Sequence, residues 1–436
     1  MTFLIIIAAI ALQIFLTYKK VSPFLSLLIV AILAGLCLGM EPKAILKSFE
    51  VGAGSTLGGI ALIICLGGVL GKILEVSGAA EQISTTLINA FGQKYIQWAV
   101  LLAGFLIGLP LFYNAGFVIV VPLIFSIARR AKLPLLYVAI PMAASLSTTH
   151  CFLPPHPGPV FLVNAFKADI GKTLIYGLIL AIPVVILAGP TFGKIFKHVK
   201  SGVEEFLFPI RSETKKLPAA FPSFLFALMP VILITLAVIA NNFMVDDSIL
   251  KKITLFIGDP TIALLLSVLL ACIFLGVKNG SSIETVMKWL NEGILGVAII
   301  LLIITAGGVF KQVLQDSGTG NYISSLSSQW KMSPLLFAWV VTALLRVTIG
   351  SATVAGITAA GVLTPLATSG TVSPELMVLA VGTGSVFGSH VNDSAFWMFK
   401  EFFKLSMKQT FLSWTIMETA ISVLGLIGVL ILQMFI

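Results

Sequence analysis

Two short segments combine titratable side chains with residues that interrupt helices. Residues 147–160 read STTHCFLPPHPGPV and place His150 and His156 among four prolines. Residues 384–397 read GSVFGSHVNDSAFW and contain, in order, Ser389, His390, Asn392 and Asp393. A proline lacks an N–H group and clashes with the preceding turn, so no continuous helix passes through 147–160. A histidine titrates near neutral pH and could therefore carry a proton or, when charged, bind a carboxylate.

Two further interruptions carry small and polar residues. Residues 109–116 read LPLFYNAG and supply Tyr113, Asn114 and Gly116. Residues 348–356 read TIGSATVAG and supply Ser351 and Thr353. Small residues let the backbone approach a solute closely, and N–H groups at the start of a half-helix attract anions. The alternative for these glycines is close packing between helices.

Arg346 and Asp393 are the most informative isolated charges. Arg346 interrupts the apolar run LFAWVVTALLRVTIGSATV. Its planar fork suits a substrate carboxylate, and the competing role is a structural partner for Asp393 or for helix-end carbonyls. An ionised carboxylate inside a membrane is costly and usually marks an ion pathway. We therefore expect Asp393, together with His150 and His390, to carry a coupling proton. The alternatives are a surface position for the acid and neutral packing for the histidines.

The composition defines the surroundings of these residues. The chain has 436 residues, of which 58% are hydrophobic and 10% charged, whereas soluble domains carry about 25% charge. Many apolar runs are long enough to cross a hydrocarbon core of ~30 Å. The sequence predicts an all-α polytopic membrane protein with about 12–14 transmembrane or re-entrant segments. The first run lacks a basic leader and a cleavage site, so we expect a retained helix.

The cysteines and the net charge do not indicate a further functional site. The four cysteines are scattered through apolar sequence, which suggests neither a disulfide nor a zinc framework. The net charge of +9 marks cytoplasmic loops more readily than a nucleic-acid surface. We expect no cofactor, no metal, no enzymatic activity and no nucleic-acid partner.

An internal repeat organises the interruptions. GGVLGKILEVSG (67–78) resembles GGVFKQVLQDSG (307–318), with six of twelve positions identical at an offset of 240. The same offset pairs Ser145 with Ser385 and His150 with His390. The predicted division is an extra helix at 1–20, repeat 1 at 21–195, a cytoplasmic linker at 196–222, an extra helix at 223–250 and repeat 2 at 251–436.

Basic loops predict how the two copies are oriented. Placing Lys19, Arg129, the linker, Lys278 and Lys400 on the cytoplasmic side makes equivalent helices run in opposite directions. The copies are then inverted and both termini are periplasmic. Paired interruptions in inverted halves are typical of a secondary transporter's binding site near the bilayer midplane, with elevator or rocking motion. The candidate substrate contacts are Tyr113, Asn114, Gly116, Ser145, His150, His156, Arg346, Ser351, Thr353, Ser389, His390 and Asn392.

The same motifs resemble the gluconate permease family. The resemblance covers nearly the whole chain, and the most specific strings are THCFLPPHPGP at 149–159 and SHVND at 389–393. It implies a proton-coupled importer of gluconate or a related sugar acid in a bacterial inner membrane, with re-entrant hairpins and usually a homodimer. The family pattern has an acid where this chain has Asn114, which puts coupling or specificity in question there. An amide can still donate and accept hydrogen bonds to a polyol.

Several alternatives stay open from the sequence. Within the transporter class these are another small organic acid or D-serine as substrate, and sodium as the coupling ion. A passive channel is a further possibility. From a different class comes an intramembrane enzyme with His150, His156 and Asp393 as metal ligands, although no HExxH-like motif is present.

Overall fold

The protein is an all-helical membrane protein. The computed structural model describes residues 2–198, 217–245, 248–318 and 332–436, and these contain helices but no strand. Within them, seven helices are long and apolar enough to cross a membrane, or eight if the bent pair Ala79–Phe91 and Gln93–Gly108 forms one span. Four shorter apolar helices accompany them: Leu4–Leu16, Pro23–Cys37, Pro334–Ile349 and Ala352–Ala367. The predicted fold class is confirmed.

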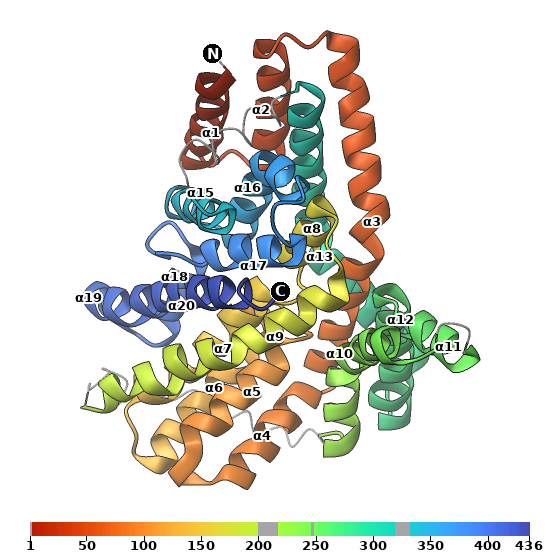
Figure 1. Ribbon diagram of the computed structural model, residues 1–436. Coiled ribbons are helices and arrows are strands. Elements are labelled where there is room, and N and C mark those ends of the chain that lie inside the picture. The colour runs from red at the N-terminus through yellow and green to blue at the C-terminus, as the bar shows by residue number, and fades with distance from the viewer. Residues whose placement is uncertain (1, 199–216, 246–247, 319–331) are drawn as a thin grey trace.

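Two long helices form the axis of one group (Figure 1). They are α3 (Pro42–Val76) and α13 (Ile283–Asp316). α1 (Thr2–Tyr18) and α2 (Pro23–Cys37) lie beside them at one end, and α10 (Ala220–Phe243), α11 (Ile249–Ile257) and α12 (Pro260–Ala271) lie toward the other.

Glycines let α3 and α13 pack at close range. A Cβ atom on Gly52 would lie 2.8 Å from the Gly308 carbonyl oxygen, and one on Gly68 would lie 3.0 Å from that of Gly293. As the residue number rises along α3 it falls along α13, so the two helices are antiparallel. Close backbone approach at small residues is the usual way for helices to associate in lipid.

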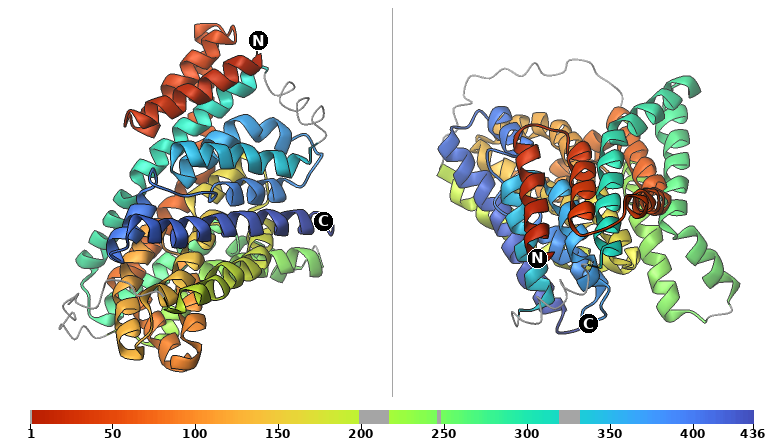
Figure 2. Two further views of the ribbon diagram at one scale, coloured as in Figure 1. Left: turned by 90° about the vertical axis from the view of Figure 1, so that its left-hand side faces the viewer. Right: turned by 90° about the horizontal axis from the view of Figure 1, so that it is seen from above.

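The remaining helices cross this axis in a second group (Figures 1 and 2). From the first half these are α4 (Ala79–Phe91), α5 (Ile96–Gly108), α6 (Tyr113–Ala131), α7 (Leu135–Phe152), α8 (Pro157–Phe166) and α9 (Ile170–Ile186), which continues through a π-helical turn at Leu187–Thr191. From the second half they are α15 (Pro334–Ile349), α16 (Ala352–Ala367), α17 (Pro374–Gly384), α18 (Ser394–Phe402), α19 (Met407–Thr410) and α20 (Ile416–Leu432), with a π-helical turn at Phe411–Thr415.

The helices break where the sequence predicts. The first break, residues 109–112, separates α5 from α6, and the second, residues 153–156, separates α7 from α8. The third break, between α15 and α16, is only Gly350 and Ser351, and the fourth, residues 385–393, separates α17 from α18. Gly350 has φ +85°, and a Cβ atom there would lie 2.3 Å from the Asn392 carbonyl oxygen. Only glycine fits this left-handed position, where the third break contacts the fourth.

The helix bounds follow the sequence repeat. The starts of α5 and α15, of α6 and α16, and of α7 and α17 are 238 or 239 residues apart. The counterpart of α4 would fall at 319–331, outside the described residues. Most of the predicted linker, 199–216, also lies outside them, and α10 begins at Ala220, three residues before the predicted extra helix. The division into domains therefore stays a prediction.

The α3–α13 contact gives a stability prediction with a matched control. Gly52→Ala inserts a methyl group against the α13 backbone, which should destabilise the protein by about 1–3 kcal/mol through overpacking. Gly54, two residues away, has no atom within 4 Å of its Cβ position. Gly54→Ala should therefore be neutral or slightly stabilising. Thermal unfolding of the purified proteins in one detergent measures both. Equal melting temperatures for the two variants would contradict the close α3–α13 packing.

Candidate functional site

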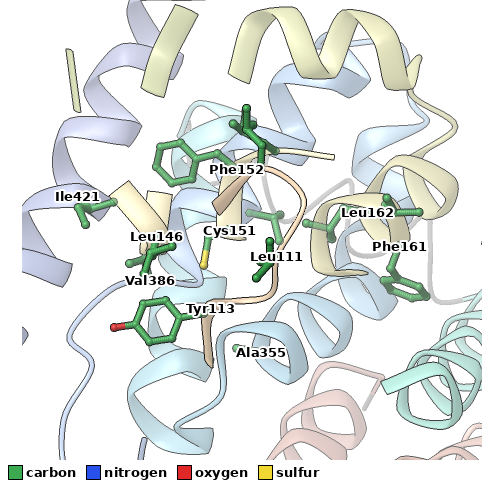
Figure 3. Close-up of a cluster of buried hydrophobic side chains, with 14 of the residues drawn as sticks. Leu111, Tyr113, Leu146, Cys151, Phe152, Phe161, Leu162, Ala355, Val386 and Ile421 are labelled. Carbon is green, nitrogen blue, oxygen red and sulfur yellow. The ribbon is translucent and has the colours of Figure 1, made fainter. Parts of the chain in front are cut away.

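Residues beside three of the four helix breaks, the second, third and fourth, line one small cavity. Its wall combines the end of α7, the start of α8, the start of α16 and the end of α17: His150, Cys151, Gly158, Pro159, Leu162, Ala352, Thr353, Gly356, Gly382 and Ser385. The cavity measures about 10 Å³, which is room for roughly one water molecule. Figure 3 shows a cluster of buried apolar side chains in the same region, in which Leu111, Cys151, Leu162, Ala355 and Val386 come from segments at or beside the four breaks.

A buried ion pair joins the third break to the fourth. Arg346, in the last turn of α15, donates through Nη2 to Oδ2 of Asp393. The two residues are 2% and 8% exposed. Asp393 also accepts from the Ser389 hydroxyl at 2.6 Å and from the Ala395 N–H at 2.9 Å, which makes it the N-cap of α18. The Nε and Nη1 atoms of Arg346 have no hydrogen-bond partner among the described residues.

Aromatic side chains connect the first break to this pair. The Trp414 indole N–H donates to Ser389 Oγ at 2.7 Å, and the same hydroxyl donates to Asp393. The Tyr113 ring lies 5.7 Å from the Trp414 ring, edge to face. The Tyr113 hydroxyl is buried and, within the described chain, lacks a partner. Tyr113 and Ser389, both predicted site residues, therefore belong to one cluster with Asp393.

The two histidines of the opening motif lie side by side. Their ring centroids are 5.1 Å apart. His156 is held by a hydrogen bond from Nε2 to the Gly108 carbonyl oxygen at 2.6 Å, which joins the second break to the first. His150 lines the cavity, and its Nδ1 is buried without a partner in the described residues. His150 is thus the histidine whose hydrogen-bonding capacity is available to a solute.

Two helix starts also face the cavity. Gly158 lies in the first turn of α8, and Ala352 and Thr353 lie in the first turn of α16. The first N–H groups of a helix have no partner within the helix and carry a partial positive charge. Ser351 is the N-cap of α16 and accepts from the Val354 N–H. Arg346 does not line the cavity but interacts electrostatically with Cys151 in its wall. Together, these helix starts and the guanidinium are suited to an anion.

Other predicted residues make contacts within the protein. The Ser145 hydroxyl donates to the Leu101 carbonyl oxygen at 2.8 Å. A Cβ atom on Gly116 would meet Leu146 at 2.9 Å, so this glycine lets α6 approach α7. Asn114 is exposed. His390 and Asn392 both hydrogen-bond to the Val347 carbonyl oxygen, at 3.0 Å and 2.8 Å, and thereby fix the break after α17 against the end of α15.

Sequence reasoning missed one acid in this region. Glu418 in α20 is 3% exposed and accepts from the Ser147 hydroxyl at 2.5 Å. Glu418 lies close enough to interact electrostatically with Arg346 and Asp393. The available signal is the same as for Arg346, a single charge within a long apolar run, here residues 411–436. Trp414, which bonds Ser389, lies in the same run.

Two other parts of the structure are less suited to bind a metal or an anion. A metal site at His150, His156 and Asp393 would need the carboxylate oxygens that Arg346, Ser389 and the Ala395 N–H already occupy. A larger hollow of about 550 Å³ lies where α2 and α13 end and α3 begins. Its wall carries the carboxylate of Asp316, which is held by Ser48 and Gln312. None of the four helix breaks lines that hollow.

The buried ion pair predicts that removing Asp393 alone destabilises the protein more than removing both charges. Asp393→Asn leaves the Arg346 charge buried without its counterion, which should cost about 3–5 kcal/mol of folding free energy. Adding Arg346→Gln to Asp393→Asn should recover part of that loss, because the uncompensated charge is then gone. Glu401→Gln removes an exposed partner of Lys400 and should change little. Denaturant unfolding in detergent compares the four proteins. A double variant less stable than Asp393→Asn would contradict this account.

The sequence of this chain matches a family of known proteins. The sequence profile of the GntP family permeases matches residues 1–435. The Gnt-II system L-idonate transporter of Escherichia coli is 45% identical, with 99% of this chain and 98% of that protein covered. A high-affinity gluconate transporter of Escherichia coli is 46% identical over 96% and 95%, and a gluconate permease of Bacillus subtilis is 42% identical over 95% of each.

Solved structures resemble the fold at much lower identity. The Alcanivorax borkumensis YdaH transporter matches with a TM-score of 0.68 at 17% identity, covering 97% of each chain. Neisseria gonorrhoeae MtrF matches with a TM-score of 0.63 at 14% identity, covering 94% of each. These two similarities support the fold alone. The profile match and the identities above 40% go further, and the chain belongs to the GntP family of permeases.

Proposed function

We propose that this permease imports gluconate or a closely related sugar acid together with a proton. The observation that carries the proposal is the buried guanidinium of Arg346, which keeps two nitrogen atoms without partners in the described chain beside the point where the helix breaks meet. A buried cation with unused N–H donors attracts a carboxylate. The names of relatives that transport gluconate and L-idonate support a sugar acid as the substrate.

The cavity supplies groups for the rest of such a molecule. The Thr353 hydroxyl and His150 Nδ1 can each exchange hydrogen bonds with a polyol chain. The first-turn N–H groups of α16 add donors for the carboxylate. The space of about 10 Å³ is far too small for a six-carbon acid. This arrangement is therefore a closed one, and substrate entry requires the starts of α8 and α16 to move apart.

Proton coupling follows from the direction of transport. Moving one negative charge into a cell against an inside-negative potential costs about 2.3 kcal/mol per 100 mV. One proton entering with each monoanion cancels this charge and leaves the pH gradient as the driving force. The carriers expected from the sequence are Asp393, His150 and His390. Of these, His150 alone lines the cavity, while the other two are held by neighbouring groups.

Membrane placement and assembly belong to the same proposal. The permease would lie in a bacterial inner membrane with both termini periplasmic, as the basic loops indicate. The antiparallel packing of α3 and α13, which occupy equivalent positions in the sequence repeat, supports two inverted repeats. A homodimer is proposed from the family resemblance.

Uptake into proteoliposomes tests the function. Purified protein should accumulate labelled gluconate above the external concentration when the lumen is alkaline relative to the outside. Collapsing the pH gradient with a protonophore should abolish the accumulation. Competition by unlabelled L-idonate, other aldonates and D-serine ranks the substrates, and empty vesicles are the control.

Other outcomes would overturn parts of the proposal. Accumulation that needs a sodium gradient would exclude the proton as the driving ion. Flux that only equilibrates gluconate would indicate a channel. Absence of gluconate flux combined with transport of D-serine would reject the substrate class.

A further inference from the structure

We propose that Glu418 binds the coupling proton and that its charge controls whether Arg346 can bind the substrate carboxylate. The inference rests on the proposed symport function and identifies the residue that links proton and anion. It assigns the coupling proton to a residue other than the three expected from the sequence.

The position of Glu418 is unusual for an acid. It lies in the apolar span Met407–Leu432 and is 3% exposed. Within the described part of the chain, its one hydrogen-bond partner is the Ser147 hydroxyl on α7, and no Lys, Arg or His side chain forms an ion pair with it. An ionised carboxylate with a single neutral donor is poorly compensated for its lost hydration. The neutral, protonated acid is therefore the form that this closed arrangement favours.

Asp393 differs in the groups around it. Its carboxylate receives the Arg346 guanidinium, the Ser389 hydroxyl and the Ala395 N–H. These contacts fix the position of the Asp393 carboxylate and of the guanidinium bonded to it. Asp393 is accordingly suited to hold Arg346 in place, and Glu418 is the acid suited to gain and lose a proton.

Electrostatics couples Glu418 to the anion site. Glu418 interacts with both Arg346 and Asp393 across the site. When Glu418 is ionised, two carboxylates face one guanidinium, and a third negative group from the substrate is repelled. When Glu418 is protonated, the net charge of the cluster rises by one. The unused N–H groups of Arg346 can then donate hydrogen bonds to a substrate carboxylate.

Other titratable groups near Glu418 do not replace it. Cys151 on α7 and Tyr113 on α6 both interact with Glu418. The π-helical turn that continues α9, Leu187–Thr191, packs against α20 and has no titratable side chain. On α17 the one acid is Glu375, in the first turn, where it is bound to Ser373 and the Asp169 N–H. The titratable residues of α9, Lys172 and Tyr176, lie in its first two turns. The contact of α9 with α20 lies further along α9, where Leu180 meets Gly428.

Transport then follows a simple proton cycle. On the periplasmic side Glu418 takes up one proton, becoming a neutral acid, and the monoanion binds at Arg346. On the cytoplasmic side the anion leaves and the carboxyl releases the same proton to water. Because binding couplings are reciprocal, anion binding must favour protonation of Glu418 as strongly as protonation favours anion binding.

The pH dependence of gluconate binding tests this linkage. For the wild-type protein, affinity should fall as the pH rises, approaching about tenfold per pH unit where one proton is linked to binding. Glu418→Gln imitates the protonated acid, so it should bind gluconate with nearly constant affinity over the same range. It should also retain exchange of internal for external gluconate while losing accumulation driven by a pH gradient. Scintillation proximity binding and proteoliposome transport measure these quantities.

Two variants serve as comparisons. Glu284→Gln alters an exposed acid at the start of α13 and should keep the wild-type pH dependence. His150→Gln should weaken binding at every pH while keeping the slope. A Glu418→Gln protein with the wild-type slope would overturn the inference, and so would loss of the slope in His150→Gln alone.

A measurement on the wild-type protein covers the case in which Glu418→Gln does not fold. Dicyclohexylcarbodiimide modifies protonated carboxyl groups in apolar surroundings. Peptide mass analysis should find Glu418 modified at low pH, with less modification as the pH rises. No modification of Glu418 at any pH would overturn the inference. This labelling needs no substrate, so it separates failure of the proton site from failure of the proposed substrate, which would appear as no gluconate binding by the wild type.

Discussion

Backbone groups in a hydrocarbon environment must find partners within the protein, and this constraint shapes the whole permease. A helix can break inside a membrane only where other segments receive the freed N–H and carbonyl groups. Four such breaks lie in the described part of the chain, and they bond to one another in pairs. His156 bonds the Gly108 carbonyl oxygen, and the Asn392 amide bonds that of Val347. The contact of the second break with the first, and of the fourth with the third, thus follows from their need for partners.

The gathered breaks concentrate polar chemistry in an apolar protein. The same region holds the Arg346–Asp393 pair, the cavity-lining His150 and the buried acid Glu418. The antiparallel pair α3 and α13 lies outside this cluster and is held by close glycine contacts. One group of helices is therefore built for tight apolar packing and the other for polar contacts.

The sequence predicted the features that depend on backbone chemistry. Proline, glycine and the repeat register located all four breaks, because those residues restrict the backbone wherever they occur. Arg346 and Asp393 could be named as possible partners, since each is a lone charge near a break. The structure shows that they are paired. It also shows Ser145 bound to Leu101, a contact between helices that no local pattern encodes.

Glu418 shows where the sequence reasoning stopped. It is a lone charge in the apolar run 411–436, as Arg346 is in its own run, but it lies in none of the four breaks. Its relation to Ser147 depends on α20 packing against α7, a contact between residues 271 positions apart. Asn114 shows the opposite limit: its place in a motif suggested a role, and the fold leaves its side chain exposed.

A gluconate-bound structure of the permease at side-chain resolution tests the central claim most directly. The account predicts density for the sugar acid between the separated starts of α8 and α16, with its carboxylate at Arg346 and its hydroxyls near Thr353 and His150. Density in the hollow beside α2, α3 and α13, with the four breaks still closed on one another, would contradict it.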